Sequence, residues 1–270
     1  MPAAVRLVHP APTLAVVALS AALAAILLAR SSEPLGAGPI ALVALTVLGS
    51  QIAVGALNDW ADRDRDRIAQ PSKPIPAGEL TPRTALVVAA VGLGLQVVTS
   101  AALGPLPLVI GLAALASAVA YNLWLSRTPL SIVPYLVSFG LLPLWVAAGL
   151  QVPLDRVAAA VVVAGPFAGA AHLANTVRDF EADAGVGSRS LAQVLGRRRA
   201  FWLAWTMALS VGVLVGTAFV VGGRLSGPVL ALGVIGLLAV AQGIRGPRPL
   251  WGGMLVAAVA WTSAWAMASA

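Results

Sequence analysis

Long apolar segments separated by short polar ones dominate this chain. A helix needs about 17 to 25 mainly apolar residues to cross the hydrocarbon core of a bilayer. Segments of that kind lie near residues 12–29, 38–57, 84–103, 106–124, 130–150, 157–175, 200–221, 227–243 and 250–268. The pattern therefore predicts an all-α integral membrane protein with nine transmembrane helices, in which residues 1–270 form a single transmembrane domain.

The amino-acid composition agrees with a membrane location. Hydrophobic residues make up 59% of the chain and charged residues only 10%, whereas about one quarter of the residues in soluble domains are charged. The chain contains no cysteine, which excludes thiol catalysis, disulfides and cysteine metal ligands. We therefore look for its chemistry among oxygen and nitrogen side chains.

The positions of the basic residues predict how the helices are oriented. If the N-terminus is cytoplasmic and nine helices follow, only Arg30, Arg156 and Arg224 face the opposite side of the membrane. The cytoplasmic side then holds Arg6, Arg63, Arg65, Arg67, Lys73, Arg83, Arg127, Arg178, Arg189, Arg197, Arg198, Arg199, Arg245 and Arg248. This asymmetry follows the positive-inside rule, and it accounts for most of the net charge of +7 without a nucleic-acid partner. We expect the protein in the inner or plasma membrane of the cell.

One polar signature occurs twice, each time at the predicted cytoplasmic end of an apolar helix. The two copies are Asn58-x3-Asp62-x3-Asp66 and Asn175-x3-Asp179-x3-Asp183. Residues four positions apart lie on one face of a helix, so each copy predicts an acidic stripe, and Asp59 joins the first. Asp64 and Glu181 take equivalent places on the opposite side of each helix and serve as internal controls. The active site is accordingly expected to face the cytoplasm.

The matched signatures also indicate a weak internal repeat. The second to fifth helices form one predicted half and the sixth to ninth helices the other, with the first helix added in front. The evidence for this repeat is the matched spacing and the similar order of the helices, because the apolar residues around the signatures carry little information.

The residue types in the two stripes suit a divalent metal ion. Carboxylates and an asparagine carbonyl supply the oxygen ligands that Mg²⁺ prefers, and Mg²⁺ often shares them with substrate phosphates. The candidate metal ligands are Asn58, Asp59, Asp62, Asp66, Asn175, Asp179 and Asp183. The candidate catalytic residues are Asp62, Asp66, Asp179 and Asp183. Two facing stripes of this kind are suited to binding a diphosphate.

Basic residues beside the stripes supply candidate contacts to that diphosphate. Arginine forms paired hydrogen bonds to phosphate and lysine supplies a compact charge. The candidates are Arg67, Lys73, Arg127, Arg178 and Arg189. Three prolines and a glycine within residues 67–78 predict that the helix ends near Ala69 and that a stiff loop holds Lys73 near the first stripe.

The two histidines have no metal-binding spacing. Both His9 and His172 are therefore interpreted mainly as structural residues. His172 lies three residues before Asn175 and is also a candidate substrate contact at the second stripe.

The first signature, Asn58-Asp59-x2-Asp62-x3-Asp66, together with Asp179-x3-Asp183, resembles the motifs of the UbiA superfamily of intramembrane prenyltransferases. The resemblance covers nearly the whole chain. Lys73-Pro-x-Pro-x-Gly78 is similar to the basic, proline-containing element that follows the first motif in this family, and Asn175 with Arg178 matches a pattern of some branches. The segment from Tyr121 to Arg127 departs from the family, which often has a Lys-Arg pair where this chain has Ser126-Arg127.

The resemblance implies a bundle of nine helices in two pseudo-repeated halves around a central cavity that opens to lipid. It also implies Mg²⁺-dependent transfer of an isoprenyl group from an isoprenyl diphosphate to a lipophilic acceptor within the membrane, with Tyr121 and Asn122 among the substrate contacts. The expected partners are thus an isoprenyl diphosphate, the lipophilic acceptor and membrane lipid. An aromatic acceptor is expected because it is the commonest case in the family, and the residues leave chlorin, glycerol phosphate and saccharide-linked acceptors open.

Three other functions deserve comparison with prenyl transfer. A UbiA-like terpene cyclase would use the same donor site and capture the cation within its own isoprenyl chain. A secondary transporter also has intramembrane acids and two halves, but it needs those acids near the bilayer midplane, and these stripes lie at helix ends. A CDP-alcohol phosphotransferase requires an Asp-Gly and Ala-Arg spacing that this chain lacks.

Overall fold

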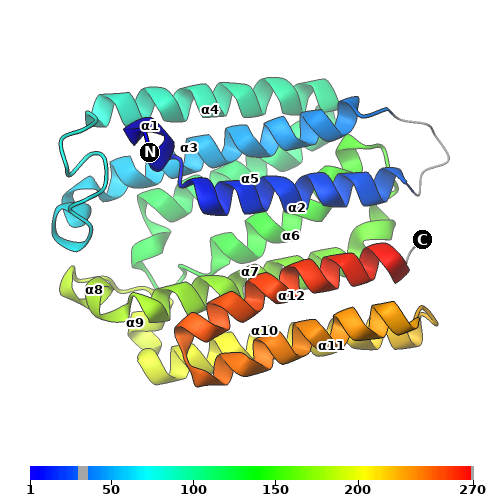
Figure 1. The fold of residues 1–270 in the computed structure, drawn as a ribbon. Coiled ribbons are helices and arrows are strands. Elements are labelled where there is room, and N and C mark those ends of the chain that lie inside the picture. The colour runs from blue at the N-terminus through cyan, green and yellow to red at the C-terminus, as the bar shows by residue number, and fades with distance from the viewer. Residues whose placement is uncertain (30–35, 269–270) are drawn as a thin grey trace. The chain divides into compact units, whose positions relative to one another are not determined.

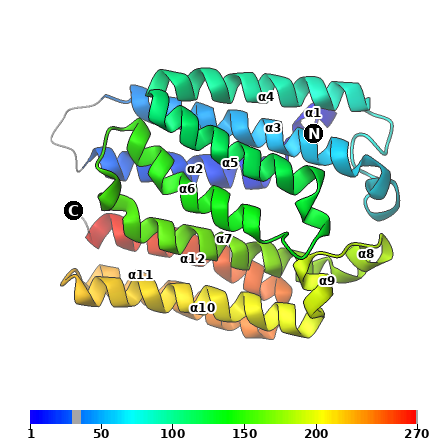
Figure 2. The same cartoon turned by 180° about the vertical axis from the view of Figure 1, so that it is seen from behind.

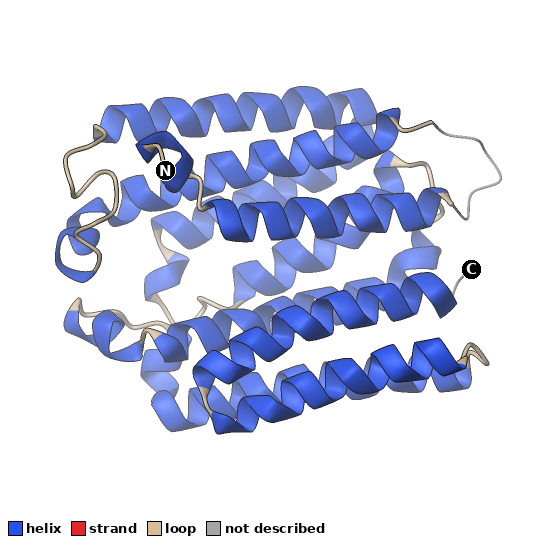
Figure 3. Ribbon diagram, in the orientation of Figure 1, coloured by secondary structure: helices blue, strands red, loops and turns tan. Residues whose placement is uncertain are grey.

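The computed structural model of the chain describes residues 1–29 and 36–268, so Arg30 lies outside the described residues. Within these two stretches all regular structure is helical, as Figure 3 shows. Eight helices are long and apolar enough to cross a membrane, and a shorter apolar helix, Val133–Gly149, corresponds to the predicted fifth span. The predicted all-α membrane fold is confirmed, and each of the nine predicted spans coincides with an apolar helix.

The described chain divides into two compact units, and each is considered by itself. The first unit consists of Met1–Ser126 and Leu141–Ala158. Its helices are α1 (Ala3–Leu7), α2 (Pro10–Leu28), α3 (Gly38–Ala69), α4 (Pro82–Leu103), α5 (Pro105–Leu123), most of η1 (Leu125–Arg127), the second half of α6 (Val133–Gly149) and η2 (Leu154–Val157). Helix α3 packs against α2, α4 and α5, and Figures 1 and 2 show these four helices side by side.

The second unit consists of Arg127–Gly140 and Ala159–Ala270. Its helices are the first half of α6, α7 (Ala158–Arg178), α8 (Phe180–Gly185), α9 (Leu191–Leu195), α10 (Arg197–Val221), α11 (Gly227–Ala241), η3 (Gln242–Arg245) and α12 (Pro247–Ala268). Helix α11 packs against both α10 and α12. The core of this unit is built from side chains of α7, α10, α11 and α12, mostly small or aliphatic, among them Leu173, Ala204 and Met254, together with the indole of Trp261.

Helix α6 is shared between the units, so the boundary differs from the predicted halves. Early in α6, the backbone at Leu136 approaches α7 so closely that a Cβ on Gly165 would lie 2.6 Å from its carbonyl oxygen. Later in α6, the indole of Trp145 donates a hydrogen bond of 3.2 Å to Ser100 Oγ on α4. The two ends of one helix thus pack into different units, and a boundary drawn between helices does not capture this. The single domain over residues 1–270 stays a prediction.

The first acidic signature occupies the last part of α3, which is 32 residues long. About 20 residues are enough to cross a bilayer, so the helix extends beyond its apolar part and carries the signature at its end. The helix ends at Ala69, as the prolines that follow it predict.

Close packing against α4 holds α3 in place. A Cβ on Gly49 would lie 2.6 Å from the backbone nitrogen of Gln96, and one on Gly92 would lie 2.5 Å from that of Ala53. Small residues let membrane helices approach in this way. A hydrogen bond of 2.7 Å from Thr46 Oγ1 to Thr99 Oγ1 joins the same two helices. The helix that carries the signature is therefore closely packed against α4.

This crossing predicts opposite effects for two neighbouring glycines. Gly92→Ala places a methyl group against the backbone of α3 and should lower the free energy of unfolding by about 1–3 kcal/mol, the usual cost of overpacking. Gly94→Ala is the control on the same helix, because a Cβ there meets no atom within 4 Å. It should be neutral or slightly stabilising. Unfolding of the two purified variants in detergent measures the difference, and equal stabilities would contradict the close crossing.

Candidate functional site

The first acidic stripe separates into two groups with different partners. In one group, Asn58 Nδ2 lies 3.4 Å from Asp62 Oδ2 and donates to Asn122 Oδ1 at 3.3 Å. Asn122, on α5, is 2% exposed and donates its own amide to the backbone oxygen of Val54 at 2.8 Å. Asn122 was predicted to contact substrate, and its observed contacts support the backbone and side chains of α3.

The other group is a buried network of Asp59, Asp66 and Lys73. The ammonium of Lys73 lies 2.9 Å from Asp59 Oδ1 and 2.8 Å from Asp66 Oδ2. The side chains of Lys73, Asp59 and Asp66 are 16%, 1% and 6% exposed. Burial on its own lowers the pKa of Lys73, but the two carboxylates outweigh it and hold the pKa above its ordinary value of 10.5. Lys73 is therefore charged at neutral pH.

The loop after α3 places Lys73 beside the stripe, as its prolines predict. The loop folds on itself through backbone hydrogen bonds of 3.0 Å from Lys73 to Gln70 and from Ala77 to Lys73. Ile75, 9% exposed, anchors it in a small apolar cluster, and Gly78 turns the chain at a φ of 75°. These local contacts fix the backbone position from which the long side chain of Lys73 extends.

His9 is a neighbour of the site that the sequence interpretation missed. Its Nε2 lies 3.1 Å from Asp59 Oδ1. The two residues are 50 positions apart, and no spacing rule connects them. The only signal in the sequence is that His9 stands just before the first apolar segment, on the same predicted side of the membrane as the stripe.

The remaining charged residues of α3 differ in how much of each side chain is exposed to solvent. Asp62 is 16% exposed on its side chain and lies 3.2 Å from Arg65 Nη1. Asp64, the internal control, is 69% exposed and pairs with Arg63 at 3.7 Å and with Arg67 at 3.5 Å. Arg67, predicted to contact diphosphate, therefore lies with the control acid on the exposed side of the helix.

The second signature does not lie on one continuous helix, and that part of the prediction is wrong. Helix α7 ends at Arg178, and Asp179, with φ −98° and ψ 15°, precedes the short helix α8. Backbone hydrogen bonds from Asp179 to Asn175 at 3.2 Å and from Asp183 to Asp179 at 3.0 Å still keep the three residues one turn apart. The stripe is thus bent at its middle residue.

Charged pairs surround this second signature. Arg178 donates from Nε and Nη2 to the two carboxylate oxygens of Asp179, at 3.1 and 3.0 Å. Glu181, the second control, is 77% exposed and lies 3.2 Å from Arg197. Arg189 is exposed and forms no ion pair or hydrogen bond within the described part of the chain. The structure thus places Arg178 directly on the signature.

The remaining candidate contacts, His172, Tyr121 and Arg127, differ in burial. His172 is 4% exposed and stacks on Tyr135 of α6, with ring centroids 4.3 Å apart. Tyr121 is half-buried near the end of α5, and Arg127 is exposed at the end of η1. His172 is therefore packed inside the second unit rather than exposed at its polar end.

The donor atoms around the signatures fit Mg²⁺. Among residues 1–29 and 36–268, no group of three or more His, Asp or Glu side chains could enclose an ion by itself. Mg²⁺ does not require such a cage, because it usually keeps several waters and takes one or two carboxylates together with phosphate oxygens. Asp59 Oδ2 is also buried without a hydrogen bond to any described residue, which is costly for a carboxylate oxygen unless a cation approaches it.

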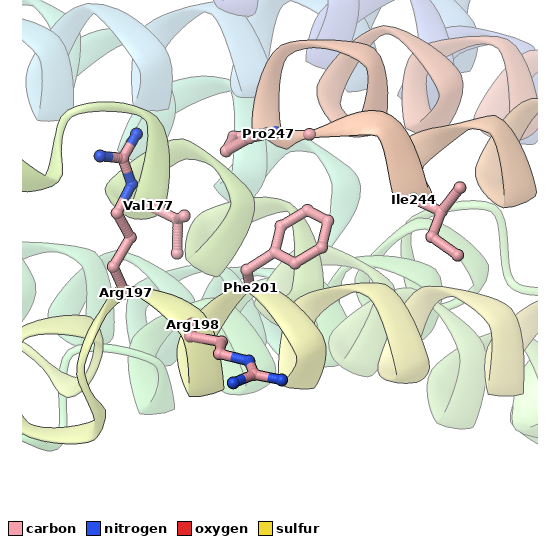
Figure 4. A pocket seen from close by; sticks show the side chains of 7 residues that line it. Val177, Arg197, Arg198, Phe201, Ile244 and Pro247 are labelled. Carbon is pink, nitrogen blue, oxygen red and sulfur yellow. The ribbon is translucent and has the colours of Figure 1, made fainter.

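A separate hollow in the second unit contains none of the predicted site residues. It has a volume of about 290 Å³ and is lined by Val177, Arg197, Arg198, Phe201, Ile244, Gly246 and Pro247. Figure 4 shows Phe201 between the other apolar side chains, with the guanidinium groups of both arginines at the edges. Because its lining is mainly apolar and lacks a carboxylate, we do not assign the reaction to this hollow.

Comparison with known proteins gives one family. The family model of the UbiA prenyltransferase family matches residues 18–249. A digeranylgeranylglyceryl phosphate synthase from Halobacterium salinarum is 31% identical over 243 residues, which are 80% of this chain and 82% of that protein. The protein of the same name from Natronomonas pharaonis is 33% identical over 169 residues, 60% of each chain. The solved structure of a UbiA homolog from Archaeoglobus fulgidus bound to GPP and Mg²⁺ has the same fold, with a TM-score of 0.72 at 17% identity over 99% of this chain and 100% of that one.

The buried network predicts a large stability difference between two basic residues. Lys73→Met leaves two buried carboxylates without their cation, and removing one partner of a buried ion pair costs about 3–5 kcal/mol. We expect the lower end of that range, since Lys73 keeps some exposure. Arg67→Met removes an exposed pair worth about 0–1 kcal/mol. Unfolding in detergent with a metal chelator present measures both variants, and a Lys73→Met loss as small as that of Arg67→Met would contradict the network.

Proposed function

The chain belongs to the UbiA prenyltransferase family, and on that premise we propose that it transfers an isoprenyl group from an isoprenyl diphosphate to a lipophilic acceptor within the membrane. The observation that carries this proposal is the concentration of carboxylates at the end of α3, with Lys73 buried among them. A membrane protein rarely buries so much charge without a function for it.

In the proposed reaction, the bond between the allylic carbon and the diphosphate oxygen breaks, and its electron pair leaves with the diphosphate. The acceptor then bonds to the allylic carbon and loses a proton. Mg²⁺, when bound, supplies positive charge that stabilises the departing diphosphate. The residues proposed to hold it are Asn58, Asp59, Asp62, Asp66, Asn175, Asp179 and Asp183.

Several basic side chains beside the two signatures are the proposed contacts to the diphosphate. Lys73 is charged and fixed between Asp59 and Asp66, so its ammonium is already in place beside the proposed metal ligands. Arg178 is held on Asp179 by two hydrogen bonds, and Arg189 is exposed. We propose that these three, together with Arg127, contact the diphosphate from the cytoplasmic side of the inner or plasma membrane, whereas Arg67 lies with Asp64 on the exposed side of α3.

Two classes of acceptor molecule are candidates. The aromatic class predicted from the sequence is our first candidate, with the half-buried Tyr121 as the proposed contact. A glycerol phosphate lipid that carries an isoprenyl chain is the second, because the relatives from Halobacterium and Natronomonas are named digeranylgeranylglyceryl phosphate synthases. The two classes differ in the atom that attacks: a ring carbon or phenol oxygen in the first and an alcohol oxygen in the second.

Substitution of the signatures tests the assignment of the carboxylates. Asp62→Asn and Asp179→Asn should each lower turnover by about 100-fold or more, because each replaces a carboxylate proposed to bind the Mg²⁺ whose positive charge stabilises the departing diphosphate. Asp64→Asn and Glu181→Gln should be close to wild type, since their side chains are 69% and 77% exposed and pair with surface arginines. Release of diphosphate by the purified protein is the measurement, and equal losses at all four positions would contradict the site.

Product analysis separates transfer from its rivals. Purified protein in lipid vesicles should consume isoprenyl diphosphate only when Mg²⁺ and an acceptor are both present, with products identified by mass spectrometry. Prenyl diphosphates of several lengths are screened against aromatic acceptors in one arm and glycerol phosphate lipids in the other. A cyclised hydrocarbon formed without an acceptor would instead support a terpene cyclase, and uptake into vesicles that persists without Mg²⁺ would support a transporter.

A further inference from the structure

The N-terminal segment, residues 2–9, packs directly over the first signature. Leu7 is fully buried and forms one apolar cluster with Ala56 of α3, Ile75 of the lysine loop and Ala85 of α4. The backbone of the segment runs so close to α3 that a Cβ on Gly55 would lie 3.3 Å from Leu7 O and from a ring carbon of His9. This segment is therefore part of the wall of the site.

Two polar side chains of this segment reach the two sides of the buried network. Arg6 donates to the backbone oxygen of Ser72 at 3.3 Å and forms an ion pair with Glu79, so it holds the loop on both sides of Lys73. His9 reaches Asp59, the carboxylate that Lys73 contacts. One short segment thus restrains both partners of an ion pair.

The two carboxylate oxygens of Asp59 differ in their hydrogen bonding. Oδ1 lies 2.9 Å from Lys73 Nζ and 3.1 Å from His9 Nε2. An ionised carboxylate only accepts hydrogen bonds, so His9 donates from Nε2. Oδ2 is buried and has no hydrogen bond to any of the residues described. With Oδ1 held by two donors, the carboxylate cannot rotate freely to satisfy Oδ2.

We infer that His9 is a positioning residue for the first signature: by holding Oδ1 of Asp59, it keeps Oδ2 as the oxygen available to a divalent cation. This inference rests on the proposed function. Outer residues that orient a metal ligand through its second atom typically change metal affinity by about 10–100-fold when they are replaced. A histidine that only tied the N-terminus to α3 would change stability and leave metal affinity unaltered.

Direct metal binding by the full-length protein tests this inference without turnover. Mn²⁺ is the probe in place of Mg²⁺, and free Mn²⁺ is measured by electron paramagnetic resonance in detergent with a non-hydrolysable isoprenyl thiodiphosphate present, against a control that contains the thiodiphosphate without protein. His9→Leu should weaken Mn²⁺ binding by about 10-fold or more. His9→Gln keeps an N–H donor at a similar reach and should recover most of the affinity. Val5→Ala, on the exposed side of α1, is the control and should bind as wild type.

The outcomes separate this inference from the function on which it rests. If the wild-type protein and the His9→Leu variant bind Mn²⁺ with equal affinity, the inference about His9 is wrong, and the proposed metal role is unaffected. Wild-type protein that binds no Mn²⁺ overturns the proposed metal role and the inference with it. If His9→Leu does not fold, His9→Asn carries the test, because its shorter side chain does not reach Asp59. Tight binding by His9→Gln and weak binding by His9→Asn then support the inference, and equal binding contradicts it.

Discussion

Neutralisation of buried negative charge is the constraint on which the first unit depends. Asp59 and Asp66 are almost fully shielded from solvent, and an ionised carboxylate in such surroundings is stable only beside a cation or strong donors. Lys73 meets this requirement for both residues. Three features restrict where its ammonium can lie: the prolines of its loop, the buried Ile75, and the contacts of Arg6 with the loop on both sides of Lys73. Lys73 contacts only one oxygen of Asp59, and Asp59 Oδ2 stays buried without a hydrogen bond to any described residue, which is the oxygen proposed to bind a divalent cation.

This constraint links the fold to the proposed chemistry. The glycine crossing with α4 and the hydrogen bond from Asn122 to Val54 hold α3, so the backbone that carries its carboxylates is held in a fixed position. Preorganised charge is effective because it need not rearrange during the reaction. In the second unit, Arg178 and Asp179 form a corresponding pair at the end of α7. Each signature thus combines carboxylates with a basic side chain that is already charged.

Much of the fold and part of the site could be predicted from local features of the sequence. Apolar length located the nine long apolar helices of the described residues, the prolines predicted the end of α3 at Ala69, and helical phase separated the exposed Asp64 from the stripe. The contacts of His9 and Asn122 could not be predicted, because they join residues 50 and 64 positions apart through packing. The bend at Asp179 and the division of α6 also depend on neighbouring helices, which a helical period does not reveal.

The proposal that carries the most weight is that binding of a metal-bound diphosphate requires the carboxylates of both acidic signatures. Electron nuclear double resonance of Mn²⁺ with a non-hydrolysable isoprenyl thiodiphosphate tests it most directly, because it detects phosphorus nuclei bonded through oxygen to the ion. A phosphorus coupling is expected in the wild-type complex, and it should be lost in single-site variants of either signature. A coupling that survives intact when the carboxylates of one signature are replaced by amides would contradict it.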